Sequence, residues 1–157
     1  MNKRSDLMQN AEDYLGQIRI IDRRINAELS RLHDMKLGAM STGAIDYSKD
    51  RVQTSPKNTL ELTVCRYVEQ ERRIDELIDI LIDARYKMIY QIRRIDREEY
   101  VQILILIYVQ LKSLRTASRE MRVSYDDAIG LRENALAEFA ALNTDYRNFV
   151  AECEYIE

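Results

Sequence analysis

The sequence contains few of the residues that interrupt helices, bind metals or form disulfide frameworks. Its 157 residues include one proline, four glycines, no tryptophan, two cysteines and one histidine. So few helix breakers predict long helices and exclude an all-β fold, which needs many turns. Cys65 and Cys153 lack CxxC partners, and His33 lies far from both. We therefore expect no metal site, no cofactor and no disulfide framework.

The chain also lacks an excess of positive charge and a long hydrophobic run. Its 24 basic and 27 acidic residues give a net charge of −3, so the composition does not by itself indicate a nucleic-acid partner. The first fifteen residues contain no apolar signal segment. The most apolar run, Val101 to Leu111, is too short to span a bilayer. These features predict a cytoplasmic protein with no membrane partner.

The first pattern along the chain is a helical spacing of apolar residues between Leu7 and Met35. Apolar residues recur there at steps of four and three, which predicts a helix with a narrow stripe facing a partner helix. The stripe consists of Leu7, Ala11, Tyr14, Ile18, Ile21, Ile25, Glu28, Leu32 and Met35. Gly38 is predicted to end this helix.

Residues 38–57 are predicted to form a long loop between two helices. The segment holds two glycines, the only proline and many Ser, Thr and Asp residues, and loops of this length are usually functional or mobile. Arg51 and Gln53 within it are candidate binding residues. Ser55 and Pro56 form a candidate N-cap and first-turn pair for the next helix.

A second helix is predicted from Lys57 to Ile95, with the same four-three spacing. Its stripe is Leu60, Val64, Tyr67, Glu71, Ile74, Ile78, Leu81, Arg85, Met88, Ile92 and Ile95. The two charged members either set the register of pairing or extend their long side chains to solvent. Further apolar residues widen the stripe beyond what the first helix can cover. We therefore expect an antiparallel hairpin, with the excess covered by a further helix or by a second subunit in a homodimer.

The remaining chain is predicted to form shorter helices. Asp96 is a candidate N-cap for a helix that continues through Val109 and is apolar nearly all round. Ser113 would cap a helix over 114–121, and Ser124 would cap a last helix that runs to about Cys153 or breaks near Asn143. The expected fold is all-α, with a coiled-coil-like hairpin over residues 1–95. A helix-turn-helix-like domain with a C-terminal helical tail follows over residues 96–157.

Residues 114–131 match the size pattern of a helix-turn-helix. Small or apolar residues suit the core positions, namely Ala117, Ser118, Met121, Val123, Ala128 and Leu131. Arg122 occupies the turn position, which prefers glycine because it needs a positive φ. Candidate DNA-binding or partner-binding residues are Lys112, Arg115, Arg119, Arg122, Tyr125, Asp126, Ile129 and Arg132.

These candidate residues divide by role. The cations of the first helix would hold phosphates, while Tyr125, Ile129 and Arg132 would contact bases. The second helix carries one arginine against four acids along Tyr125 to Leu142. Asp126 and Asp127 at its start oppose the approach of a phosphate backbone.

Several segments together resemble a known family. They are Tyr14-Leu15 with residues 18–25, the stretch 50–56, Tyr108-Val109 ahead of Leu114, Ser124-Tyr125, and Ala135-Leu136. The chain resembles the small sigma-region-four-like proteins of Gram-positive phages and prophages. The resemblance implies a helical hairpin, a C-terminal helix-turn-helix and a role in transcription regulation. The family usually has glycine at the turn and basic or His residues after Ser124-Tyr125, where this chain has Arg122, Asp126 and Asp127.

Two functions follow as expectations. The first is a phage-type transcription regulator that binds duplex promoter DNA, host RNA polymerase or both. The alternative is a helical protein-binding module, an inhibitor of another host protein, that has lost DNA binding. No enzymatic activity is expected, because the sequence has no Gly-rich phosphate loop, no GxSxG motif and no carboxylate pair placed for acid-base chemistry.

Overall fold

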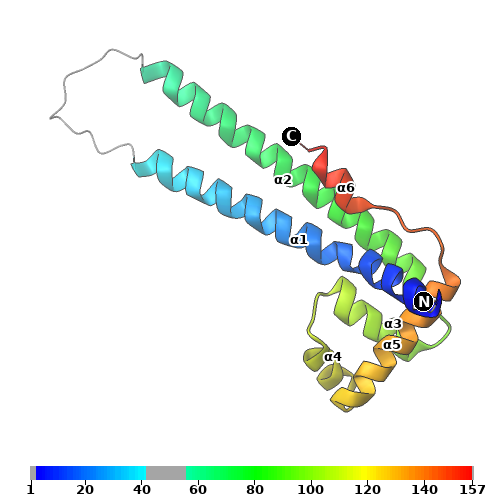
Figure 1. The fold of residues 1–157 in the computed structure, drawn as a ribbon. Helices are drawn as coiled ribbons and strands as arrows, with labels where there is room; N and C mark the ends of the chain where they lie inside the picture. Colours follow the sequence, from blue (N-terminus) through cyan, green and yellow to red (C-terminus); the bar gives the residue numbers. More distant parts are fainter. Residues whose placement is uncertain (1–2, 42–55, 157) are drawn as a thin grey trace.

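The computed structural model describes residues 3–41 and 56–156, and these residues confirm the all-α fold, with no strand among them. The helices are α1 (Lys3–Ser41), α2 (Pro56–Ile92), α3 (Glu98–Leu104), the π-helical segment η1 (Ile105–Val109), α4 (Leu114–Met121), α5 (Tyr125–Leu142) and α6 (Phe149–Glu154) (Figure 1). None of the helices in the described residues combines the length and the apolar character that crossing a bilayer requires.

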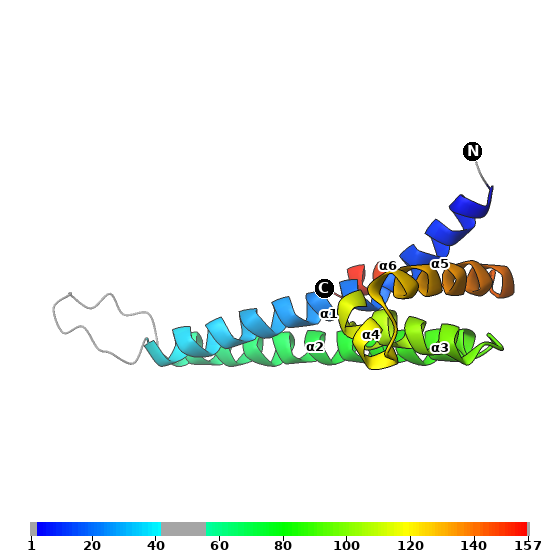
Figure 2. The ribbon, with the colours of Figure 1, turned by 90° about the horizontal axis from the view of Figure 1, so that it is seen from below.

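Helices α1 and α2 lie side by side and antiparallel, helices α3, α4 and α5 gather at one end of this hairpin, and α6 lies along it (Figures 1 and 2). The predicted stripe of α1 faces α2 and the core, with Ala11, Tyr14, Ile18 and Ile21 buried. Its first member, Leu7, is exposed instead.

The predicted end of the first helix is wrong. Helix α1 continues through Gly38 to Ser41, because a glycine with helical φ costs a helix only about 1 kcal/mol relative to alanine. The edges of the predicted loop, residues 38–41 and 56–57, are therefore helical. Pro56 opens α2 as expected. The rest of the loop, with Arg51, Gln53 and Ser55, lies outside the described residues.

The residues of α2 that face α1 differ from the predicted stripe, because every second member is shifted by one residue toward the N-terminus. The buried residues are Gln70, Ile74, Leu77, Leu81, Ala84, Met88, Gln91 and Ile95, together with Ile92. Glu71, Ile78 and Arg85 from the predicted stripe lie outside this seam, with Glu71 and Ile78 exposed. The two charged members of the predicted stripe thus indicated the neighbouring register, in which Gln70 takes the place of Glu71 and Ala84 that of Arg85.

Both glutamines form hydrogen bonds to α1. The Gln70 amide donates to the Glu28 carboxylate at 2.7 Å, so the polar member of each stripe lies opposite the other. The Tyr14 hydroxyl donates to Gln91 Oε1 at 2.7 Å, and the Gln91 amide donates to the Asp145 carbonyl at 2.9 Å. Because buried polar groups are costly unless they are paired, these bonds fix the register of the hairpin.

The connection from α2 to α3 differs from its prediction at the cap. Helix α2 ends at Ile92 rather than Ile95, and Arg97, not Asp96, is the N-cap of α3, with no side-chain cap bond. The apolar helix through Val109 is buried as expected, but its last turn is π-helical, with the Gln110 amide donating to the Ile105 carbonyl. Leu111 then adopts a φ of 58°, which redirects the chain into α4.

Of the two predicted alternatives, the structure has the break near Asn143: helix α5 ends there. The tail then returns along the hairpin as α6 (Figure 1). The tail is held by the Lys87–Asp145 ion pair at 2.8 Å and by stacking of Tyr146 on Tyr14, with ring centroids 4.8 Å apart. Phe149 and Cys153 are buried against α1 and α2. The tail therefore covers part of the apolar excess of α2.

Candidate nucleic-acid interface

Helices α4 and α5 are each capped by a serine, as the sequence predicts. Ser113 Oγ accepts a hydrogen bond from the Thr116 amide at 3.1 Å. Ser124 Oγ accepts from the Asp127 amide at 3.0 Å and donates to the Asp127 carboxylate at 2.6 Å. Asp127 is thus part of the N-terminal cap of α5, where the helix dipole also favours an acid.

The turn between α4 and α5 is a left-handed C-cap centred on Arg122, with φ 57° and ψ 39°. The Arg122 amide donates to the Arg119 carbonyl, and the Val123 amide donates to the Ser118 carbonyl at 3.0 Å. These two bonds form a Schellman motif. Arginine therefore takes the backbone conformation for which glycine is preferred, and the turn keeps its expected geometry.

The small residues at the crossing of the two helices are buried. Ala117, Ser118 and Ala128 are inaccessible or nearly so, while Met121, Val123 and Leu131 pack against the core at its edge. The Ser118 hydroxyl donates to the Arg115 carbonyl at 3.0 Å, which satisfies it within α4. Helices α4 and α5 therefore form the expected helix-turn-helix arrangement.

Three arginines extend into solvent from α4 and the turn. Arg115, Arg119 and Arg122 are exposed, and no ion pair within the described residues involves them. The Arg115 guanidinium lies 5.9 Å from the centre of the Tyr125 ring, so these two candidate residues are neighbours. Lys112 is held by Glu120, with Nζ 2.7 Å from a carboxylate oxygen.

The start of α5 presents a mixed surface. Tyr125 and Asp126 are exposed and Ile129 is partly buried. Arg132 extends toward α1, where its guanidinium lies 3.7 Å from the Glu12 carboxylate. Arg115 and Tyr125 are therefore neighbours, and Arg119, Arg122 and Asp126 are exposed on the same two helices and their turn, whereas Arg132 pairs with Glu12 of α1. We call Arg115, Arg119, Arg122, Tyr125 and Asp126 the α4–α5 face.

Arg132 lies instead in a hollow of about 630 Å³ between α1, η1 and α5. The Tyr108 hydroxyl donates there to Glu12 at 3.3 Å. Burial raises the pKa of Tyr108 above its ordinary value, and the nearby Glu12 carboxylate raises it further. Glu12 thus joins both side chains, and sequence spacing gave no signal of it because it lies far away in the chain.

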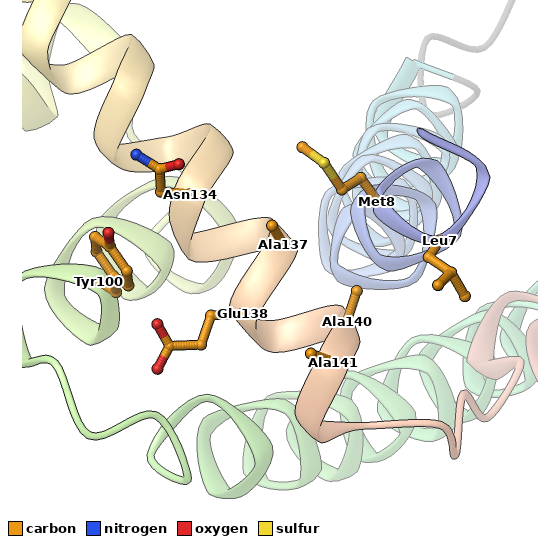
Figure 3. A pocket seen from close by; sticks show the side chains of 8 residues that line it. All are labelled: Leu7, Met8, Tyr100, Asn134, Ala137, Glu138, Ala140 and Ala141. Carbon is orange, nitrogen blue, oxygen red and sulfur yellow. The ribbon is translucent and has the colours of Figure 1, made fainter. Parts of the chain in front are cut away.

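A second hollow, of about 580 Å³, lies between α1, α3 and α5 (Figure 3). Alanines 137, 140 and 141, with Leu7 and Met8, form most of its lining, and Glu138 is the one carboxylate among the eight lining residues. Such a lining offers packing surface rather than acid-base chemistry. No group of three His, Cys, Asp or Glu residues in the described chain is placed to hold a metal ion.

The α4–α5 face combines three arginines with the exposed ring of Tyr125 and the carboxylate of Asp126. Arginine side chains can bind phosphate oxygens in a bidentate manner, and a tyrosine ring can stack on a base or pack on a protein surface. Asp127 stays exposed beside this face while its carboxylate accepts a hydrogen bond from Ser124, so three arginines face two carboxylates, Asp126 and Asp127. No protein family model, curated protein or solved structure matches this chain.

Proposed function

We propose that the protein is a transcription regulator resembling sigma region four. Its α4–α5 face binds duplex promoter DNA, host RNA polymerase or both. The observation that supports this proposal is the helix-turn-helix arrangement of α4 and α5, with Arg115, Arg119 and Arg122 exposed beside the start of α5. The resemblance to the phage sigma-like proteins gives the biological setting.

On DNA, the arginines of α4 contact phosphates and position the protein, while Tyr125 approaches base edges at the start of α5. The negative charge of Asp126 repels the phosphate backbone of DNA close to it. Because Arg132 is held by Glu12, few groups remain for reading bases. The proposed interaction with DNA is therefore dominated by charge and depends strongly on salt.

Fluorescence anisotropy with a labelled duplex at low salt tests the DNA part of this proposal. We expect Arg115→Ala combined with Arg119→Ala to weaken binding about a hundredfold or more, since each lost charge-assisted contact costs about 1.5–3 kcal/mol. Arg23→Ala with Arg66→Ala is the matched control, because both arginines are exposed on the hairpin away from α4. Equal binding by both double variants would remove the α4–α5 face as the DNA site.

A protein-binding module is the second candidate function. The acids exposed along α5, which are Asp126, Asp127 and Glu133, favour a protein surface over a phosphate backbone, and so does the pairing of Arg132 with Glu12. Affinity purification from host lysate with the wild-type chain and with the Arg115/Arg119 variant separates the two. Polymerase subunits lost with the variant support the regulator, whereas one different host protein captured through α5 supports an inhibitor.

A further inference from the structure

Helix α2 carries a second apolar stripe on a side turned away from α1. Its members are Val64, Val68, Ile78, Ile82, Tyr86 and Tyr90, all exposed, and the two tyrosines are 73% and 74% accessible. Isolated exposed apolar residues are ordinary, but these recur at helical spacing over several turns. Glu71, Asp75 and Arg93 continue the same line. We call these nine residues the outer face of α2.

The C-terminal tail does not cover this face. Helix α6 and the segment before it contact a different side of α2, where Lys87 pairs with Asp145 and Gln91 binds the Asp145 carbonyl. In Figure 2, α2 runs along the lower edge of the hairpin, with α1 above it. The apolar members of the outer face are exposed, so a second helix can contact them.

Charge is distributed unevenly along the outer face. Its acids, Glu71 and Asp75, precede Ile82, with Asp79 beside them, and its base, Arg93, directly follows the last residue of α2. Two such faces paired in parallel would place like charges opposite each other. In an antiparallel pair with a two-fold axis near Ile82, Glu71 and Asp75 of one copy lie near Arg93 of the other copy. Antiparallel helix dipoles add to this preference.

We propose that the outer face of α2 binds the same face of a second copy of this chain, as an antiparallel, two-fold symmetric helix pair. Ile78, Ile82 and Tyr86 form the apolar centre of the contact, and the Glu71, Asp75 and Arg93 side chains form its charged flanks. Such an interface is self-complementary, as a two-fold dimer requires. The occupant is a second copy because the charge pattern of the face complements itself.

Light scattering during size-exclusion chromatography of the full chain tests the dimer. We expect a particle of twice 18.6 kDa for the wild type and a monomer for Ile82→Asp, with unchanged helical circular dichroism. The matched control is Ile20→Asp, since Ile20 is exposed on α1, away from the outer face, and this variant should remain a dimer. A wild-type monomer at every concentration, or dissociation of Ile20→Asp but not of Ile82→Asp, would overturn the proposal.

Charge reversal tests the same contact without altering apolar residues. Arg93→Glu should weaken the dimer, because it places an acid opposite Glu71 and Asp75 of the second copy. Adding Glu71→Lys and Asp75→Lys to the same chain should restore it. Failure of the restored triple variant to dimerise, while it remains folded, would contradict the antiparallel arrangement.

Cys65 gives a direct measure of orientation. It is exposed near the start of α2, whereas Cys153 is buried, so a spin label attaches selectively to Cys65. About 17 residues separate it from the axis at Ile82, which places the two labels about 50 Å apart in the antiparallel pair. A parallel pair would bring the two helix axes within about 10 Å at this point, and a correspondingly short label distance would overturn the proposed orientation.

Discussion

Arg122 holds the turn between α4 and α5 in a backbone conformation that costs an L-residue free energy. Its φ of 57° allows the two carbonyl contacts that end α4, and its side chain extends into solvent. The same residue therefore serves two purposes, since glycine would suit the turn better but would remove a cation from the α4–α5 face.

Replacing Arg122 by glycine should separate these two purposes. We expect Arg122→Gly to stabilise the fold by about 1 kcal/mol, because the left-handed conformation costs a residue with a Cβ about 1–2 kcal/mol. Urea unfolding measures the change. Arg119→Gly, within α4, should instead destabilise by about 1 kcal/mol. A loss of stability in Arg122→Gly would show that its side chain has a structural role.

Two buried tyrosines make stability depend on alkaline pH. Burial raises the pKa of Tyr14 and Tyr108 above the ordinary value of 10.0, and the Asp145 and Glu12 carboxylates raise them further. Above that pH the unfolded chain loses these protons while the folded chain retains them, so the free energy of unfolding falls as pH rises. This stabilising contribution is fully present below about pH 10.

Thermal unfolding followed by circular dichroism from neutral to strongly alkaline pH measures this dependence. We expect a constant Tm up to about pH 10 and a steep fall above it. The fall should be shallower in Tyr14→Phe, which cannot ionise at that position. An equal slope in the two proteins would show that Tyr14 ionises as readily in the folded state as in the unfolded state.

At the scale of the helices, local patterns were sufficient for most elements. Apolar spacing predicted α1, α2 and the short helices, and Ser113 and Ser124 were identified as caps because their bonds lie within three residues. The register of α2 was not predictable in the same way. Two neighbouring stripes have the same spacing, and the choice between them depends on Gln70 meeting Glu28 and Gln91 meeting Tyr14, which are contacts between distant segments.

The register predicts different costs for two adjacent alanine substitutions. Leu77 is 2% exposed in the seam, whereas Ile78 is 36% exposed on the outer face. Leu77→Ala should therefore destabilise dilute protein by about 2–5 kcal/mol and Ile78→Ala by less than about 1 kcal/mol. Chemical denaturation of both variants compares them, and a larger cost for Ile78→Ala would favour the register that the sequence pattern suggested.

At the scale of the whole molecule, the hairpin and the helix-turn-helix share one buried core. A single cluster joins α1 and α2 to α3, η1, α4, α5 and Phe149 of α6. The candidate face depends on this packing, because Glu12 of α1 holds Arg132 and so determines which side chains remain on the surface. The α4–α5 residues were predictable from the sequence, but the position of Arg132 was not, since its partner Glu12 belongs to the distant hairpin.

A shared core predicts cooperative unfolding. Amides near Ile18 in α1 and near Leu136 in α5 should exchange hydrogen with the same opening free energy, because neither region keeps its apolar surface buried without the other. Native-state hydrogen exchange measures both regions in one experiment. A markedly lower opening free energy for α5 would instead indicate that the helix-turn-helix unfolds by itself.

The most direct test of the α4–α5 face is the salt dependence of duplex DNA binding. Each phosphate contact made by an arginine adds nearly one unit to the slope of log K against log salt concentration. We expect the slope of the Arg115→Ala/Arg119→Ala variant to be smaller than that of the wild type by about two, while Arg23→Ala/Arg66→Ala leaves it unchanged. Identical slopes for all three proteins would contradict phosphate binding by this face.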